Sequence, residues 1–170
     1  MGEVRQVLNI RLASGRDEDK ITKLIAQFRV ELKQLKGIRS SINLELAKEE
    51  FYEYLEAGFP IFVAENNCDE LLGYLVCKVD DDVVWVESLF VSYDERRNGI
   101  ATKLYNEAEK LSLELGGDTL YNWIHPNNDK MIGFLAKSGY NVLNLIEITK
   151  PWKNEKTTEK ICVGNNEFQY

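Results

Sequence analysis

Residues 86–104 read VESLFVSYDERRNGIATKL, and this stretch joins two different periodicities. Up to Val91, the sequence is rich in β-forming residues and its pattern repeats every two residues, which predicts a β-strand. From Ile100 onward the apolar residues recur at helical spacing, which predicts a helix beginning near Asn98 or Gly99. A strand that passes through a short polar turn into a helix indicates a fold in which strands and helices are interleaved.

The turn between this strand and this helix carries Arg96, Arg97 and Gly99. Glycine lets the backbone approach a ligand closely, and a helix N-terminus presents unpaired N–H groups and positive dipole charge to an anion. Two arginines add positive charge at the same place. The turn therefore indicates a phosphate site, although an ordinary turn with a solvated arginine pair has the same composition.

The composition is ordinary for one globular domain, with 170 residues, 44% hydrophobic and 29% charged. A net charge of −7 argues against a general nucleic-acid binder, which normally carries a basic face. No apolar run approaches the ~20 residues of a membrane helix, and the N-terminus does not resemble a secretory signal. We therefore expect a cytoplasmic protein with neither a membrane nor a nucleic-acid partner.

The sequence has three widely spaced cysteines, Cys68, Cys77 and Cys162, and a single histidine, His125. An odd number of cysteines does not suggest a disulfide framework, and one histidine argues against a zinc site. We expect reduced thiols and no metal.

Periodicity and turn residues divide the rest of the chain into short elements. Helices are predicted near residues 17–35, 44–57, 98–115 and 129–137. Strands are predicted at residues 7–13, 61–65, 71–79, 83–91, 119–124 and 141–150, with 160–163 as a possible last strand.

The resulting order is β-α-α-β-β-β-α-β-α-β-(β), without regular βαβ repetition. This order predicts an α/β (α+β) fold with a mixed, mostly antiparallel central sheet of about six to seven strands and helices on both faces. We expect one domain over residues 1–170, with a core of about 8–150 and a C-terminal extension of 151–170.

The order of elements and the turn together resemble the GNAT superfamily of N-acetyltransferases over about residues 8–150. The acetyl-CoA pattern of this family, Arg/Gln-x-x-Gly-x-Gly/Ala, is matched by Arg96, Gly99 and Ala101. A second family segment is matched by Asn128 and, at the family spacing, by Phe134, Lys137, Gly139 and Tyr140.

The resemblance implies how acetyl-CoA would bind. Main-chain groups of Leu89, Phe90 and Val91 would run beside the pantetheine like an added strand. The Arg96 side chain would assist the pyrophosphate, which main-chain N–H groups would hold. Those N–H groups belong to Arg97, Asn98, Gly99, Ile100, Ala101 and Thr102. Asn128 would contact the pantetheine arm or the adenosine end, and Phe134 is a further cofactor-binding candidate.

Acetyl transfer to an amine requires a neutral nucleophile, although an alkyl amine has a pKa of about 10.4 in water. Glu87, on the strand beside the expected thioester, is the candidate base, since a glutamate occupies a matching place in polyamine-acetylating members of the family. An ordinary strand glutamate is the alternative. The resemblance implies that the main-chain N–H of Leu89 stabilises the oxyanion.

The proton donor is missing from its usual place. Most family members have a tyrosine seven residues after the motif asparagine, and here that residue is Leu135. Tyr140 and His125 are candidate replacements, as are Tyr121, Tyr105 or water. Packing for Tyr140 and a structural or surface role for His125 are the alternatives.

The resemblance therefore predicts an acetyl-CoA-dependent N-acetyltransferase acting on a primary amine of a small molecule or peptide, by direct attack in a ternary complex. The rival hypothesis is a GNAT-fold acyl-CoA sensor or scaffold. A Rossmann domain is disfavoured, because the glycine turn follows a meander rather than the first strand. The resemblance also implies a homodimer, since members of the family commonly form dimers.

The acceptor site is less defined in the sequence. Residues 33–43 are expected to form the variable substrate wall of the family, and Glu31, Arg39 and Glu45 are candidates for the acceptor pocket. The aromatic residues of the central strands, Trp85, Tyr121 and Trp123, are expected to pack in the core rather than to form a substrate cage.

Overall fold

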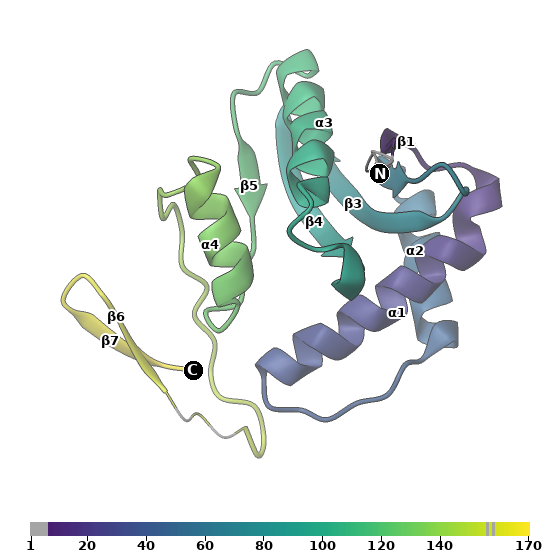
Figure 1. Cartoon of the computed structure of the whole chain (residues 1–170). Helices are drawn as coiled ribbons and strands as arrows, with labels where there is room; N and C mark the ends of the chain where they lie inside the picture. The colour runs from purple at the N-terminus through teal and green to yellow at the C-terminus, as the bar shows by residue number, and fades with distance from the viewer. Residues whose placement is uncertain (1–6, 156, 158) are drawn as a thin grey trace, which may run out of the picture. The chain divides into compact units, whose positions relative to one another are not determined.

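A five-stranded sheet forms the centre of the first 139 residues (Figure 1). Its strands follow the spatial order β1-β2-β3-β4-β5, and only the β4–β5 pair is parallel. The strands are β1 (Asn9–Leu12), β2 (Ile61–Glu65), β3 (Leu71–Asp80), β4 (Val83–Val91) and β5 (Leu120–Asn122). The mixed, mostly antiparallel sheet is therefore confirmed, with five strands instead of six to seven.

This computed structural model describes residues 7–155, 157 and 159–170. The helices lie close to their predicted positions: α1 (Glu18–Leu35), α2 (Leu44–Glu56), α3 (Ile100–Glu114) and α4 (Asp129–Lys137), with 3-10 turns η1 (Gly15–Asp17) and η2 (Tyr93–Glu95). None of the described helices is both long enough and apolar enough to cross a membrane.

Helices α1 and α2 cover one face of the sheet. The apolar stripe of α1, including Ile21 and Ile25, packs with Phe51 of α2 against Tyr74 of β3 and Phe90 of β4, and all five side chains are buried. Helix α1 also packs against α2. Burial of apolar surface at roughly 25 cal/mol per Å² makes this cluster a main source of stability.

Helix α3 covers the other face. It contacts β1, β2, β3 and β4, and it buries Ile100, Leu104 and Ala108. Cys77 and Val84 are also buried but lie outside the cluster under α1 and α2. Helices on both faces of the sheet, as the order of elements predicts, are thereby confirmed.

Residues Tyr140–Tyr170 form a second compact part, which we describe by itself. It contains an antiparallel hairpin of β6 (Lys160–Val163) and β7 (Asn166–Gln169). The last strand predicted at 160–163 is therefore present. The single-domain organisation stays a prediction.

The strand predicted at residues 141–150 is wrong, because these residues have no regular secondary structure. Their alternating apolar pattern is suited to a strand, but a strand forms only with a hydrogen-bonding neighbour. The two described strands of this part of the chain pair with each other. Val142, Leu145 and Ile148 remain more than half exposed.

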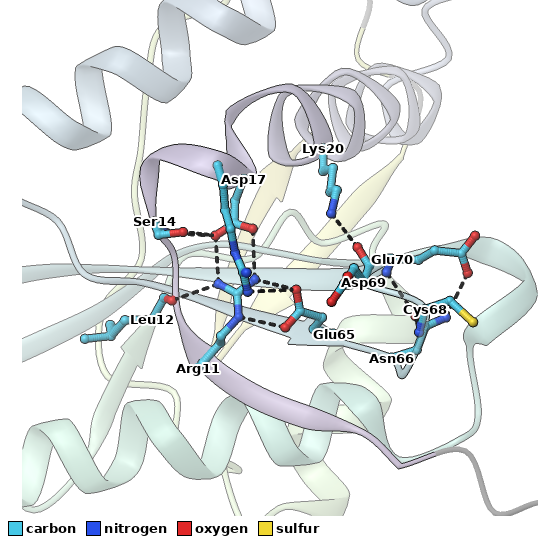
Figure 2. A network of polar contacts seen from close by, with 11 residues as sticks. Arg11, Leu12, Ser14, Asp17, Lys20, Glu65, Asn66, Cys68, Asp69 and Glu70 are labelled. Carbon is cyan, nitrogen blue, oxygen red and sulfur yellow. Dashed lines mark hydrogen bonds and ion pairs between the residues drawn. The ribbon is translucent and has the colours of Figure 1, made fainter.

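Charged groups fasten β1 to the beginning of α1 and to β2 (Figure 2). Arg11 donates to both carboxylate oxygens of Asp17, at 2.7 and 2.9 Å, and to both of Glu65, at 2.9 and 2.6 Å. Asp17 is fully buried and also accepts from the main-chain N–H and hydroxyl of Ser14. The bonds from Arg11 hold the pKa of Asp17 well below its usual range.

Arg11→Met is expected to destabilise the fold by about 3 kcal/mol, because it leaves a buried carboxylate without its partner. The depressed pKa of Asp17 contributes stability that is present above the unfolded pKa of about 3.9 and is lost as the pH falls through the folded value. The stability difference between variant and wild type should therefore shrink below about pH 4, as measured by urea unfolding across pH.

Arg16→Met is the matched control for this prediction. Arg16 also reaches Glu65, at 3.4 Å, but its side chain is 63% exposed. Such a pair contributes little to stability, so this variant should unfold within about 1 kcal/mol of wild type. Equal effects of the two substitutions would contradict a special role for Arg11.

Candidate functional site

The two parallel strands β4 and β5 part after three residue pairs. Val84, Trp85 and Val86 lie opposite Leu120, Tyr121 and Asn122. Within the described residues, no strand continues the sheet beside Glu87–Val91 on the side away from β3. This stretch of β4 therefore presents an open edge to which an extended molecule can add like a strand.

A β-bulge at Glu87 marks the beginning of the open edge. Val76 of β3 pairs with Ser88, whereas the next residue, Cys77, pairs with Val86. Glu87 is thus the extra residue, without a partner on β3. Bulges of this kind redirect side chains and are common beside active sites.

The bulge changes which face the even-numbered residues of β4 occupy. Ser88 bonds to the Tyr74 hydroxyl at 2.8 Å, and Phe90 lies in the cluster under α1 and α2. Val86 is paired with Cys77, which follows Val76 and therefore lies on the opposite face. The even positions before the bulge face α3, and those after it face α1.

Glu87 is half-buried at this point. Its carboxylate makes no hydrogen bond or ion pair with any residue in the described ranges 7–155, 157 and 159–170. Ion pairs engage other carboxylates of this part of the chain, such as Asp17, Glu31 and Glu50. Glu87 is therefore available to bind an amine or to accept a proton.

The main-chain groups of residues 89–91 do not all point to the open edge. Ser92 donates its N–H to the Leu72 carbonyl, and a Cβ on Gly73 would lie 2.7 Å from the Phe90 carbonyl oxygen. The main-chain N–H and C=O groups of Phe90 and Ser92 therefore point to β3. Because backbone groups alternate along a strand, those of Leu89 and Val91 point to the open edge. Of the three residues expected beside the pantetheine, Leu89 and the N–H of Val91 are placed to bond there, whereas the Val91 carbonyl already accepts from Arg96 and the main chain of Phe90 is turned away.

The turn after β4 contains two left-handed residues, Arg97 with φ 70° and Gly99 with φ 75°. Gly99 is the N-cap residue of α3, and its carbonyl accepts from Lys103 at 3.1 Å. The N–H groups of the first helical residues, Ile100, Ala101 and Thr102, precede this first helical bond and have no partner in the helix.

No side chain of the described residues caps α3, whereas Asn43 caps α2 and Asn128 caps α4. Arg97, Asn98, Gly99 and Thr102 are exposed. The turn thus offers main-chain donors that have no partner in the helix, the positive end of a helix and the side chain of Arg97, a combination suited to a phosphate group.

Arg96 is engaged differently from Arg97. It is half-buried and bonds to Val91 of β4 and Glu31 of α1. Its guanidinium also lies 4.3 Å from the ring centre of Tyr93. The side chain expected to assist the pyrophosphate is thus already bound within the protein.

The second motif segment forms the beginning and the body of α4. The Asn128 side-chain oxygen accepts from the Met131 N–H at 3.1 Å, which caps the helix. Phe134 packs edge-on against Tyr105 of α3, with ring centres 5.4 Å apart. Leu135, in the place of the usual tyrosine, is 7% exposed.

The candidate proton donors occupy different surroundings. His125 is half-buried in the turn between β5 and α4, and its Nδ1 accepts from the Asn127 N–H at 3.1 Å. Burial, with a smaller effect of Lys36, lowers the pKa of His125. Tyr105 donates to Asn122, and its pKa is raised mainly by burial. Tyr140 begins the second part of the chain, which is described separately.

The aromatic residues of the central strands form a stack, with Trp85 4.9 Å from Tyr121 and 4.6 Å from Trp123. Trp123 is 63% exposed, so its expected place in the core is wrong. Trp123 follows Asn122, the last residue of β5 that pairs with β4, and its ring lies against Trp85 and 5.5 Å from the Lys78 ammonium. Among the described residues, no group of three or more His, Cys, Asp or Glu side chains is placed to hold a metal ion.

Comparison with known families identifies the class of protein. The acetyltransferase (GNAT) family matches residues 28–140, which include the open edge of β4, the turn and α4. The chain belongs to this family. No sequence among the curated proteins matches it.

Solved structures with the same fold include several acetyltransferases. Aminoglycoside N-acetyltransferase AAC(6')-Iy in complex with CoA is 16% identical, with a TM-score of 0.69 over 88% of this chain and 98% of the other. A mutant form of the BH1408 protein from Bacillus halodurans is also 16% identical, with a TM-score of 0.70 over 85% and 99%. A GNAT-family acetyltransferase from Staphylococcus aureus Mu50 is 18% identical, with a TM-score of 0.63 over 78% and 84%. At these identities the likeness shows the fold.

Proposed function

We propose that this protein is an N-acetyltransferase that transfers the acetyl group of acetyl-CoA to a primary amine of a small molecule or peptide. The observation that carries the proposal is the open edge of β4, followed after a short turn by an uncapped helix N-terminus. An extended pantetheine arm with a pyrophosphate at one end fits this order of groups.

In the proposed complex, the pantetheine amides bond to the carbonyl of Leu89 and to the N–H of Val91 on the open edge. The pyrophosphate binds the N–H groups of residues 97–102, with Arg97 as an exposed cation beside them. Asn128 and Phe134, at the beginning and in the body of α4, are further contacts for the cofactor. The thioester then lies along β4 near the bulge.

The acceptor amine attacks the thioester carbon, so that a C–N bond forms and the C–S bond breaks. Glu87 takes the proton that the ammonium must lose, directly or through water. The Leu89 N–H donates to the carbonyl oxygen as negative charge develops on it. The attacking nitrogen loses its second proton to water as the C–S bond breaks. The CoA thiolate leaves and takes a proton from water or from a protein donor other than residue 135, because leucine has no proton to give.

Thiol release from acetyl-CoA across a panel of primary amines tests the proposal. We expect amine-dependent release with at least one aliphatic amine, and one acetyl group added to the amine per thiol released. The same assay with a tertiary amine is the control, since such an amine has no N–H to exchange. CoA binding without amine-dependent release would favour an acyl-CoA sensor instead.

A further inference from the structure

All three guanidinium nitrogens of Arg96 donate hydrogen bonds within the protein. Nε donates to the carbonyl oxygen of Val91 at 2.9 Å. Nη1 and Nη2 donate to the two carboxylate oxygens of Glu31, at 3.1 and 2.6 Å. The group also lies over the Tyr93 ring at 4.3 Å and near that of Phe90 at 5.2 Å. A paired fork of this kind has a fixed geometry as well as a favourable energy.

Glu31 belongs to α1, which is otherwise distant in sequence from this turn. Its side chain is 20% exposed, and Lys130 of α4 lies 4.0 Å away. Burial opposes ionisation of Glu31, but the bonds and charge of Arg96 outweigh it, and the pKa lies below its usual value. One carboxylate on α1 thus meets the turn before α3 and the first turn of α4.

The turn itself needs support. Arg97 is a left-handed residue other than glycine, a conformation that is unfavourable for a residue with a Cβ atom. Residues 97–99 are exposed. A turn that is ordered before the ligand arrives binds more tightly, because less conformational entropy is lost on binding.

We infer that Glu31 is a positioning residue for the cofactor. Glu31 fixes the side chain of Arg96, and Arg96 in turn fixes the turn of residues 97–99, the phosphate turn, relative to the end of β4. Arg96 then acts through Val91 and the turn, while the main-chain N–H groups contact the pyrophosphate. This inference rests on the proposed function, because it assumes that the turn binds CoA.

The alternative is that Arg96 binds the pyrophosphate directly, and it predicts a different change in CoA affinity. If Arg96 left Glu31 to bind the pyrophosphate directly, Glu31 would compete with CoA for the arginine. Removal of the Glu31 charge would then strengthen CoA binding, whereas the positioning role requires that it weaken binding. The direction of the change in Kd therefore distinguishes the two roles.

The test is the CoA affinity of Glu31→Gln, measured by isothermal titration calorimetry on the full chain. We expect the Kd to rise roughly tenfold, since the bond to a charged partner is lost and the turn is less ordered. In steady-state kinetics the KM for acetyl-CoA should rise while kcat stays close to wild type. An unchanged or lower Kd would overturn the inference.

Glu50→Gln is the matched control. Arg29, on the same helix as Glu31, forms a similar two-bond pair with Glu50 of α2, and the bonds of this pair do not involve Arg96. This substitution should lower stability without changing the Kd for CoA. Equal loss of CoA affinity in both variants would show a general effect of destabilised helices and would overturn the inference.

Arg96→Lys keeps the charge but loses the fork, and it provides a second, independent test. The positioning role predicts that this variant loses about as much CoA affinity as Glu31→Gln, and that the double variant loses little more, because both changes break one unit. Near-normal affinity of Arg96→Lys would overturn it. Absence of CoA binding by the wild-type chain would overturn both this inference and the proposed function.

Discussion

Gly99→Glu is expected to abolish measurable CoA binding, a loss of at least about a hundredfold in affinity. The substitution places a carboxylate at the N-cap of α3, where it would accept hydrogen bonds from the N–H groups that the pyrophosphate needs. It also places negative charge beside the bound phosphates. Calorimetric titration with CoA, and the shift in melting temperature that CoA produces, measure the effect.

The chain offers a matched control at the other end of the same helix. Gly116 is also left-handed, with φ 93°, and like Gly99 it has no atom within 4 Å of the position of an added Cβ. Gly116→Glu should therefore cost similar backbone strain, roughly 1 kcal/mol, without loss of CoA binding. Gly99→Ala, which adds strain without charge, should retain detectable binding. Normal CoA affinity of Gly99→Glu would show that the pyrophosphate binds elsewhere.

Glu87→Gln is expected to lower kcat by roughly a hundredfold, the usual contribution of a general base, with the Kd for CoA unchanged. Glutamine cannot take the proton of the ammonium, so the rate should then follow the small fraction of acceptor that is already neutral in solution. The rate of the variant should rise with pH over a wider range than that of wild type. Rates measured between about pH 6 and 10 test both expectations.

Glu53→Gln is a suitable comparison for Glu87, because Glu53 is an exposed carboxylate on α2 outside the site. It should leave kcat and the pH–rate profile unchanged. If Glu87→Gln behaved in the same way, Glu87 would be an ordinary strand glutamate. If it lowered both kcat and CoA affinity, a packing role at the bulge would explain the result better than a base.

The elements around the phosphate turn could be predicted from the sequence because local signals define them. The change of period after Val91, with a glycine between strand and helix, places the turn, and the structure begins α3 one residue after Gly99. The asparagines and aspartates of the turns near residues 66–70 and 80–82 define the meander of β2, β3 and β4 in the same way. These signals depend on residues close together in sequence.

Other features of the site depend on partners that no local pattern indicates. Buried and half-buried residues alternate along β4 without a break at Glu87, so a period of two does not show that a bulge exchanges the faces. Glu31, the partner of Arg96, lies 65 residues away along the chain. Residues 141–150 have a strand pattern, but a pattern cannot supply the neighbouring strand that a sheet requires.

The bulge at Glu87 means that β4 belongs to two hydrophobic cores that meet in a single strand. Val86 contributes to the core beneath α3, and Phe90 to the core beneath α1 and α2. Truncations at these two positions should therefore add in their effects on unfolding free energy, although they lie only four residues apart. Deletion of Glu87 would remove the extra residue, so that side chains would alternate regularly along the whole strand. One core would then have to accept side chains that now belong to the other. The candidate site is thus located at the bulge, where the side chains of β4 change from one core to the other.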